Sequence, residues 1–183
     1  SVLGMDILVN INIAPTVKMG VNLSVDGKNR IDLQGGGELA YTMNTLGDSR
    51  FTGRYNLTGG FVRYNPPIIS EKLFKIQDGS YVSWNGDIAD PQMSITAVET
   101  VRTTISEEEK NTRQVNFDIS IIIKNSLENL SVSFDLSAPE DLTLQNQLTS
   151  LTAEQRASQA MSLLIYNTYT GPGTSTTKSD LLG

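Results

Sequence analysis

The stretch FKIQDGSYVSWNGDIADPQMSI, residues 74–95, sets the pattern of the whole chain. Apolar and polar residues alternate in three short runs, and the pairs Asp78-Gly79 and Asn85-Gly86 separate these runs. A period of two is typical of a β-strand with one face turned away from water. Asp-Gly and Asn-Gly pairs favour tight turns between strands. The stretch therefore predicts three short strands that carry packing residues and no reactive group.

The same alternation extends in both directions from this stretch. Residues 115–123 form the longest alternating run and 130–136 another, while 7–13, 19–25, 31–33 and 39–43 repeat it on the N-terminal side. Gly35-Gly36-Gly37 is interpreted as a strand break. The pattern predicts about ten short strands with short connections, and such connections favour antiparallel neighbours. We expect one β-rich domain over residues 1–183, as a fragment of a larger protein.

One segment has helical periodicity. Thr152 followed by Gln155 is typical of a capping box, and Ala157, Met161 and Leu164 then recur at helical spacing. These features predict an amphipathic helix over about 153–167. The charged stretch 106–114 is expected to be a hairpin tip or loop. The tail from about 170 to 183 is low in apolar residues and is predicted to be flexible.

Composition excludes several kinds of site. The chain contains no cysteine and no histidine, which removes disulfides, thiolate or imidazole zinc ligands and imidazole bases. A net charge of −6 disfavours nucleic acid, since binding phosphates needs clustered cations. The turn aspartates, among them Asp78 and Asp87, are typical of backbone capping rather than hydrolysis. We expect no enzyme activity, no cofactor and no metal.

An ordered series of short motifs resembles the C-terminal domain of TamB, which belongs to the AsmA-like family of envelope proteins in Gram-negative bacteria. The resemblance covers roughly residues 59–169. The motifs are, in order, GGFVRYN, LFKIQDGSYVSW, ADPQMSITA, VNFDISIII and LSVSFDLSAPEDL, the last followed by a Leu-rich helix.

This resemblance implies an all-β fold with one amphipathic helix, in which a curved, taco-like and largely antiparallel sheet forms an apolar groove. It implies a protein anchored in the inner membrane that crosses the periplasm and carries phospholipid acyl chains towards the outer membrane. The implied partner is an Omp85-class outer-membrane protein similar to TamA. An assembly factor for outer-membrane proteins, acting by strand addition at an open sheet edge, is the alternative.

The groove hypothesis assigns the apolar strand parity to lipid contact and the helix to a plug formed by Ala157, Met161 and Leu164. A closed β-sandwich core, as in a plain structural or adhesive domain, would show the same alternation. The predicted groove-lining residues are Val9, Ile11, Val21, Leu23, Leu39, Tyr41, Val62, Tyr64, Phe74, Ile76, Val82, Trp84, Met93, Ile95, Phe117, Ile119, Ile121, Val132 and Phe134.

Overall fold

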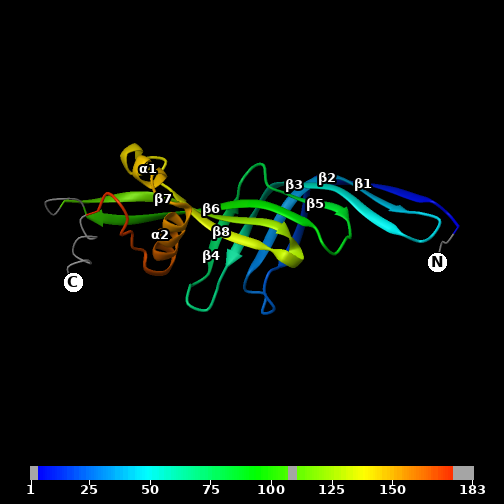
Figure 1. Ribbon diagram of the computed structural model, residues 1–183, viewed down its shortest axis with the longest axis horizontal. Helices are drawn as coiled ribbons and strands as arrows, with labels where there is room; N and C mark the ends of the chain where they lie inside the picture. The colour runs from blue at the N-terminus through cyan, green and yellow to red at the C-terminus, as the bar shows by residue number, and fades with distance from the viewer. Residues whose placement is uncertain (1–3, 107–110, 175–183) are drawn as a thin grey trace.

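A computed structural model of the chain describes residues 4–106 and 111–174, and it consists of one curved sheet with two helices at one end (Figure 1). The sheet has eight strands that pair antiparallel, with β1 and β8 at its edges. The strands are β1 (Ile7–Asn22), β2 (Arg30–Met43), β3 (Ser49–Tyr64), β4 (Lys72–Ile76), β5 (Tyr81–Gly86), β6 (Gln92–Ser106), β7 (Thr112–Ser126) and β8 (Ser131–Ser137). The predicted curved, largely antiparallel sheet is confirmed.

The strands β4 and β5 form one interrupted line rather than the predicted hairpin. Both pair with β3 on one side and β6 on the other, and residues 77–80 separate them. At this interruption the Ser80 hydroxyl accepts from the Thr96 backbone N–H (3.1 Å) and donates to the Thr96 carbonyl (3.3 Å). The buried serine thus replaces a backbone pair, so the Asp78-Gly79 turn leaves the sheet intact.

The three consecutive glycines bend a strand instead of ending it, which corrects the predicted break and reduces the number of strands. β2 runs without interruption through Gly35, Gly36 and Gly37. A Cβ atom on Gly35 or Gly37 would stand 2.0 Å from a backbone carbonyl oxygen of β3, and one on Gly36 would stand 2.5 Å from a carbonyl oxygen of β1. Only glycine allows backbones to approach this closely, so the sheet folds sharply here.

Irregularities in the neighbouring strands lie on the same line. The β1–β2 register slips between Ile13 and Val17, and the β2–β3 register shifts between Gln34 and Gly35. On β3, the Thr58 hydroxyl donates to the Pro15 carbonyl (3.1 Å) and so fixes the slip in β1. We call this line, which crosses β1 to β5, the crease. Bulges of this kind increase strand bending and twist.

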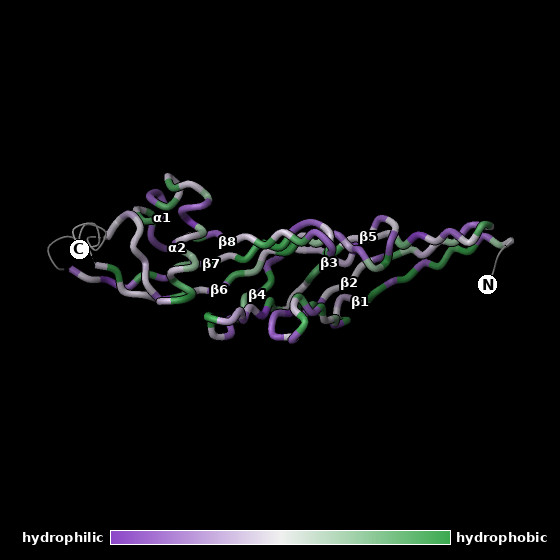
Figure 2. Tube along the Cα trace, turned by 60° about the horizontal axis from the view of Figure 1, so that its bottom comes forward, coloured by the Kyte–Doolittle hydropathy of each residue, from purple (hydrophilic) through white to green (hydrophobic). Residues whose placement is uncertain are grey.

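The crease divides the sheet into two regions. The N-terminal arm comprises residues 7–13 of β1, 37–43 of β2, 49–57 of β3 and strand β5. The trunk comprises the remaining parts of β1, β2 and β3 together with β4, β6, β7, β8 and the helices. Figure 1 shows the arm reaching towards the N-terminus and the β6–β7 hairpin reaching in the opposite direction. Figure 2, turned about the long axis, shows the same extended shape.

The trunk sheet curls until its edge strand meets the strands opposite. Phe134 on β8 contacts Tyr64 on β3, with ring centroids 5.3 Å apart, and Phe74 on β4 at 6.3 Å. In sheet order β8 is separated from β4 by β6 and β7. These contacts therefore span the concave face from side to side, and they give the trunk the cross-section of a trough.

Two helices follow β8, where the sequence predicted one. α2 (Ala153–Tyr166) begins as predicted, because Thr152 Oγ1 accepts from the Gln155 N–H and the Gln155 side chain accepts from the Thr152 N–H. The additional helix is α1 (Leu142–Thr149), capped by Asp141, with Leu144 and Leu148 fully buried. Its signals were the Asp141 cap and two leucines at i and i+4 spacing.

Parts of two predicted segments lie outside the described residues, namely 107–110 of the charged loop and 175–183 of the tail. The first part of the tail has defined contacts. The Thr170 N–H donates to the Gln159 side chain (3.0 Å), and the Tyr169 hydroxyl donates to the Pro172 carbonyl (3.0 Å). Residues 170–174 are therefore held against α2.

Candidate functional site

The concave face of the trunk is packed by the chain itself. Most of the predicted lining residues of β3 to β7 belong to one continuous core that also includes the helix leucines. The buried lining residues of the trunk are Val62, Phe74, Ile76, Met93, Ile95, Phe117, Ile119 and Ile121, and Val82 on β5 of the arm belongs to the same core. Lipid contact at these positions requires a form of the domain in which the trunk is opened, so their lining role stays a prediction.

The N-terminal arm differs because its concave face is only partly covered. Val9 is 45% exposed, and Ile11, Tyr41 and Trp84 are half-buried. By the strand pairing, the concave positions of the arm on β1, β2, β3 and β5 carry no charged side chain. Next to the crease, Tyr55, Leu57 and Val82 belong to the continuous core, whereas Leu39 and Phe51 are buried but stand apart from it. The arm beyond the crease is thus a shallow apolar surface that is partly open to solvent.

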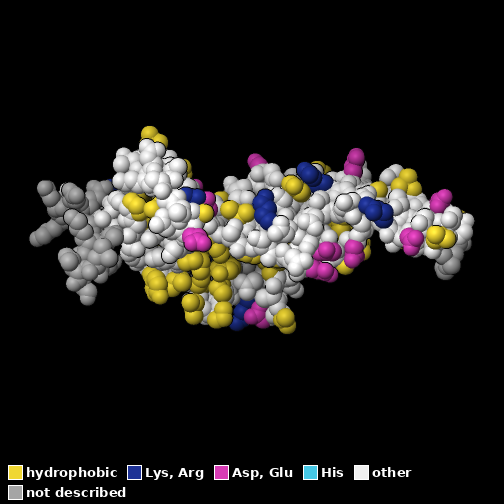
Figure 3. All heavy atoms as spheres, in the orientation of Figure 1, with side chains coloured by type: hydrophobic (Ala, Val, Ile, Leu, Met, Phe, Trp, Pro, Cys, Tyr) yellow, Lys and Arg dark blue, Asp and Glu magenta, His cyan; other side chains and the backbone are white. Residues whose placement is uncertain are grey.

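A second partly exposed group lines the mouth of the trough. Tyr64 and Phe134 are half-buried, and Val132 on the edge strand is 45% exposed. Val21 and Leu23, also half-buried, pack against the core from β1 and the turn that follows it. Figure 3 shows hydrophobic side chains gathered between α2 and the connection that leads into β4. The apolar face therefore reaches the surface at this opening.

Helix α2 and the residues after it close the end of the trunk. Leu164 is buried, Met161 is half-buried against the core, and Ala157 is half-buried. Beyond the helix, the Tyr169 ring stacks on Phe117 with centroids 4.7 Å apart. Burial raises the pKa of Tyr169 to about 12, as expected for a phenol removed from water. This geometry is compatible with the predicted plug, and the role itself stays a prediction.

Polar contacts hold this closure in register. The Arg156 Nε donates to Asp135 on β8 (2.7 Å), and its Nη1 donates to the Leu151 carbonyl (2.7 Å). On the concave face the Thr103 hydroxyl donates to the carbonyl of Asn167, the residue that ends α2 in a left-handed conformation. Since charge-assisted and buried hydrogen bonds are directional, they fix where α2 lies on the sheet.

Glu99 is a charged residue that faces the trough, and the lining prediction missed it. Glu99 shares the concave parity of β6 with Ala97 and pairs with the fully buried Ile119. Its Oε2 atom is buried and has no hydrogen-bond partner among the described residues. Burial raises the pKa of the Glu99 carboxyl, and the nearby Lys72 ammonium opposes this shift. The position after Ala97 in the β6 alternation was the signal that could have identified it.

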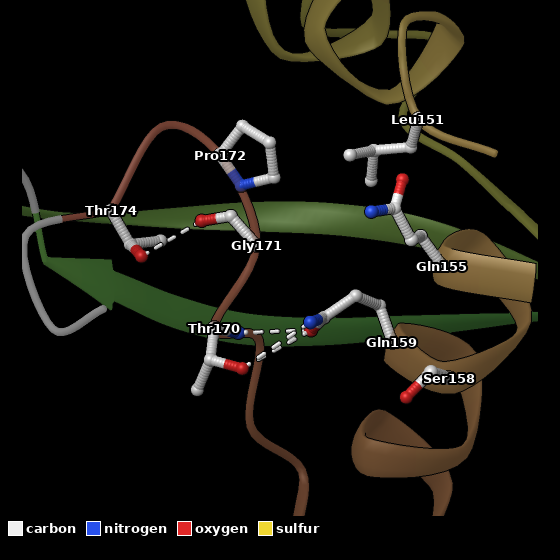
Figure 4. A pocket seen from close by; sticks show the side chains of 8 residues that line it. All are labelled: Leu151, Gln155, Ser158, Gln159, Thr170, Gly171, Pro172 and Thr174. Atoms are coloured by element: carbon white, nitrogen blue, oxygen red, sulfur yellow. Dashed lines mark hydrogen bonds between the residues drawn. The ribbon is translucent and has the colours of Figure 1, made fainter. Parts of the chain in front are cut away.

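A separate hollow lies between α2 and residues 170–174 (Figure 4). Its walls come from Leu151 in the connection between the two helices, from α2 and from residues 170–174, and the Gln159 side chain crosses the hollow to reach Thr170. Amide and hydroxyl side chains line it together with the apolar Leu151 and Pro172. No titratable side chain converges there, so this hollow offers hydrogen bonding without an acid, a base or a nucleophile positioned for catalysis.

The described residues contain no group of three or more acidic side chains placed to hold a metal ion. Within residues 4–106 and 111–174, no helix is long and apolar enough to cross a membrane. The features that remain are a concave apolar face and two free sheet edges. The β1 edge, 16 residues long, is interrupted by Pro15 at the register slip, a common protection against strand addition.

Together the single curled sheet, its apolar inner face and its terminal helix define a non-globular β-domain of the kind built around a trough. Comparison with protein families agrees with this class: the model of the TamB C-terminal domain matches residues 3–183. The chain therefore belongs to the TamB C-terminal domain family, and this membership supports a TamB-related role in the cell envelope. No curated protein and no solved structure matches it significantly.

Proposed function

We propose that this domain is a segment of a periplasmic groove protein that carries phospholipids between the inner and outer membranes and catalyses no reaction. The observation that supports this function best is the uncharged, half-open concave face of the N-terminal arm, with Val9, Ile11, Tyr41 and Trp84 on it. In the full-length protein, an inner-membrane anchor and a TamA-like outer-membrane partner would stand at the two ends of the path.

Acyl chains suit this surface for an energetic reason. Removing a methylene group from water contributes roughly 0.8 kcal/mol, and this gain does not depend on direction. A uniformly apolar face therefore holds a chain without fixing its position, which permits sliding. Headgroups can stay in water along the open side of the arm. A site for catalysis would instead need converging polar groups.

The helix plug belongs to the same proposal. α2 and Tyr169 close the trunk, so lipid held on the arm meets a sealed end. Weakening the seal should admit acyl chains as far as Tyr64 at the mouth of the trough. This expectation links Ala157, Met161 and Leu164 to regulation of access.

The test uses a photo-activatable amino acid placed at Val9 or at Leu8 of the same strand. The two neighbours point to opposite faces, and both are exposed, at 45% and 65%. After incubation with phospholipid vesicles and irradiation, mass spectrometry should detect lipid adducts at Val9 and few at Leu8. Equal labelling of the two positions, or labelling at neither, contradicts lipid binding by the concave face.

A charged substitution on the arm is a second test of lipid binding. Ile11→Asp should reduce lipid labelling at Tyr41 at least tenfold, because acyl chains and an ionised carboxylate cannot share this surface. Ile119→Asp and Val82→Asp are unsuitable, since both positions are buried in the continuous core and a charge there should unfold the domain. Asn10→Asp, on the opposite face of the same strand, is the matched control.

The second candidate function, assembly of outer-membrane proteins by strand addition, is supported by the length of the free edge strand β1. Leu8→Pro and Val9→Pro distinguish strand addition from lipid transfer. Along β1, successive backbone N–H groups point alternately towards β2 and away from the sheet, so one proline removes a hydrogen bond to β2 and the other removes an outward N–H group. The variant that still folds is therefore the one that lacks an outward N–H group. Loss of binding to a purified TamA-type protein in that variant, with lipid labelling intact, would favour assembly.

A further inference from the structure

The convex face of the trunk carries a cluster of cations that the trough does not explain. Strand pairing places Lys18 opposite Gln34, Arg30 opposite Arg63, and Lys75 opposite Phe61. All of these residues share the parity that points away from the buried core. We call the set Lys18, Arg30, Arg63 and Lys75 the cationic patch. It lies on β1 to β4, in a chain whose net charge is −6.

One carboxylate organises the two arginines of the cationic patch. Asp32 accepts from Arg30 Nε at 2.9 Å through one oxygen and from Arg63 Nε at 2.8 Å through the other. These contacts lower the pKa of Asp32 against the opposing effect of its partial burial, so the carboxylate stays charged. Each guanidinium binds Asp32 through its Nε, so one carboxylate faces two positive charges. A second nitrogen of Arg63 lies 3.5 Å from Glu71, and Arg30 Nη1 donates to Asn22 at 3.5 Å.

A glycine makes room for this arrangement. A Cβ atom on Gly20 would stand 2.2 Å from Arg30 Nη2, so the Arg30 guanidinium lies directly over the glycine. A hollow of about 570 Å³ opens beside it, and Lys18, Arg30, Arg63 and the ring of Phe61 contribute to its walls. Guanidinium forks are suited to phosphate oxygens in both geometry and charge.

Apolar side chains are exposed among these cations. Phe61 is 46% exposed and Leu73 is 44% exposed, and they pair with Lys75 and Arg63 respectively. Phe61 lies between Asp32 on β2 and Lys75 on β4. A mixture of exposed apolar and cationic side chains is typical of faces that lie on a bilayer. The cations meet the phosphates, and the aromatic ring enters the level of the headgroups.

We infer that the cationic patch docks this domain on an anionic bilayer surface, with its convex face towards the headgroups. Among the described residues, two carboxylates, Asp32 and Glu71, contact the cations of the patch, and the four cations are therefore in excess. The excess positive charge is complementary to anionic phospholipid, and the net negative charge of the whole chain limits contact by any other face. This docking goes beyond lipid transfer, because it uses the face opposite the trough.

Co-sedimentation with vesicles tests the inference. The wild-type domain should bind vesicles of phosphatidylcholine mixed with phosphatidylglycerol, and it should bind phosphatidylcholine alone much more weakly. Lys18→Gln combined with Lys75→Gln should lower the affinity for the anionic vesicles at least tenfold, since each cation near such a surface contributes about a fivefold gain. Added salt should weaken wild-type binding in parallel.

Matched controls keep the result specific. Arg50→Gln removes one charge from an exposed arginine at the far end of the arm and should leave binding unchanged. Phe61→Ser should weaken binding with little change in its salt dependence. Equal binding of both vesicle types by the wild type, or unchanged binding by the double lysine variant, overturns the inference. Ile11→Asp separates the two proposals, because it should abolish lipid labelling on the arm and leave vesicle docking intact.

Discussion

The trunk and the N-terminal arm are made from the same alternating strands, yet one is sealed and the other is open. In the trunk, Phe117 and Ile119 are fully buried beneath the curled sheet and α2. In the arm, Val9 and Ile11 occupy equivalent positions on the sheet and remain partly in water. The difference lies in what stands opposite each face, not in the strands themselves.

This comparison teaches that an apolar strand face becomes a core only when the chain supplies a cover. The trunk has three covers, namely β8, α2 and the segment around Tyr169. Beyond the crease, the described part of the chain supplies no layer of this kind over the arm. Stability should therefore concentrate in the trunk, and affinity for an apolar ligand in the arm.

The largest expected effect comes from removing a core ring in the trunk. Phe117→Ala deletes a fully buried side chain that stacks on Tyr169, and it should lower the free energy of unfolding by about 3–5 kcal/mol. Val9→Ala in the arm should cost less than about 0.5 kcal/mol. Urea unfolding followed by circular dichroism measures both. Similar losses at the two positions would remove the distinction between trunk and arm.

The crease is tested by adding a single methyl group. Gly37→Ala places Cβ 2.0 Å from the Arg54 carbonyl oxygen, so the two strands must separate at a cost of about 1–3 kcal/mol. Gly59→Ala is the control, because the nearest atom to its added Cβ is a side-chain oxygen at 4.0 Å. Thermal unfolding of the two variants gives the comparison. A neutral Gly37→Ala would mean that the bend does not depend on close backbone approach.

The seal is tested at the start of α2. Thr152→Ala removes the acceptor for the Gln155 N–H, which is half of the capping box. This loss should lower the free energy of unfolding by about 1 kcal/mol. Hydrogen exchange should show faster opening of α2 and unchanged protection in the arm. Lipid labelling at Tyr64 should rise in the same variant. Faster exchange without increased labelling would separate helix stability from access to the trough.

The smallest effect is a pH dependence from Glu99. Burial raises the pKa of this carboxyl above its ordinary value of 4.5, so the protonated form is favoured by folding. The contribution of this carboxyl to the free energy of unfolding is complete at pH values below its pKa in the unfolded chain. It is lost as the pH rises through its pKa in the folded protein. Glu99→Gln should therefore gain stability relative to wild type at pH 7 and little at pH 4. Unfolding curves at a series of pH values measure this difference.

Asp141 supplies a control of opposite sign for the Glu99 measurement. The Arg113 guanidinium and the Leu144 N–H lower the pKa of this carboxyl below 3.8, so its contribution is present above the unfolded pKa. It is lost as the pH falls through the folded pKa. Asp141→Asn should therefore lose stability relative to wild type at pH 7, with a smaller difference in acid. The same sign in both variants would contradict these assignments.

Much of the fold was predictable because each signal was local. The alternation in 115–123 and 130–136 correctly predicted β7 and β8, and the Thr152–Gln155 pair correctly placed the start of α2. Glu99 was missed because the lining prediction followed apolar residues and passed over polar residues of the same parity. Helix α1 was missed because its eight residues are too few to show a clear helical periodicity, and the residues just before it are typical of a loop.

The sequence by itself determined that one face of these strands avoids water, since strand parity follows directly from the order of residues. It also carried the motifs that led to the TamB family. Only the tertiary structure decided where that face is shut and where it stays open. That outcome depends on the backbone approach at the glycine crease and on contacts between residues far apart in the chain, such as Phe134 with Tyr64 and Tyr169 with Phe117.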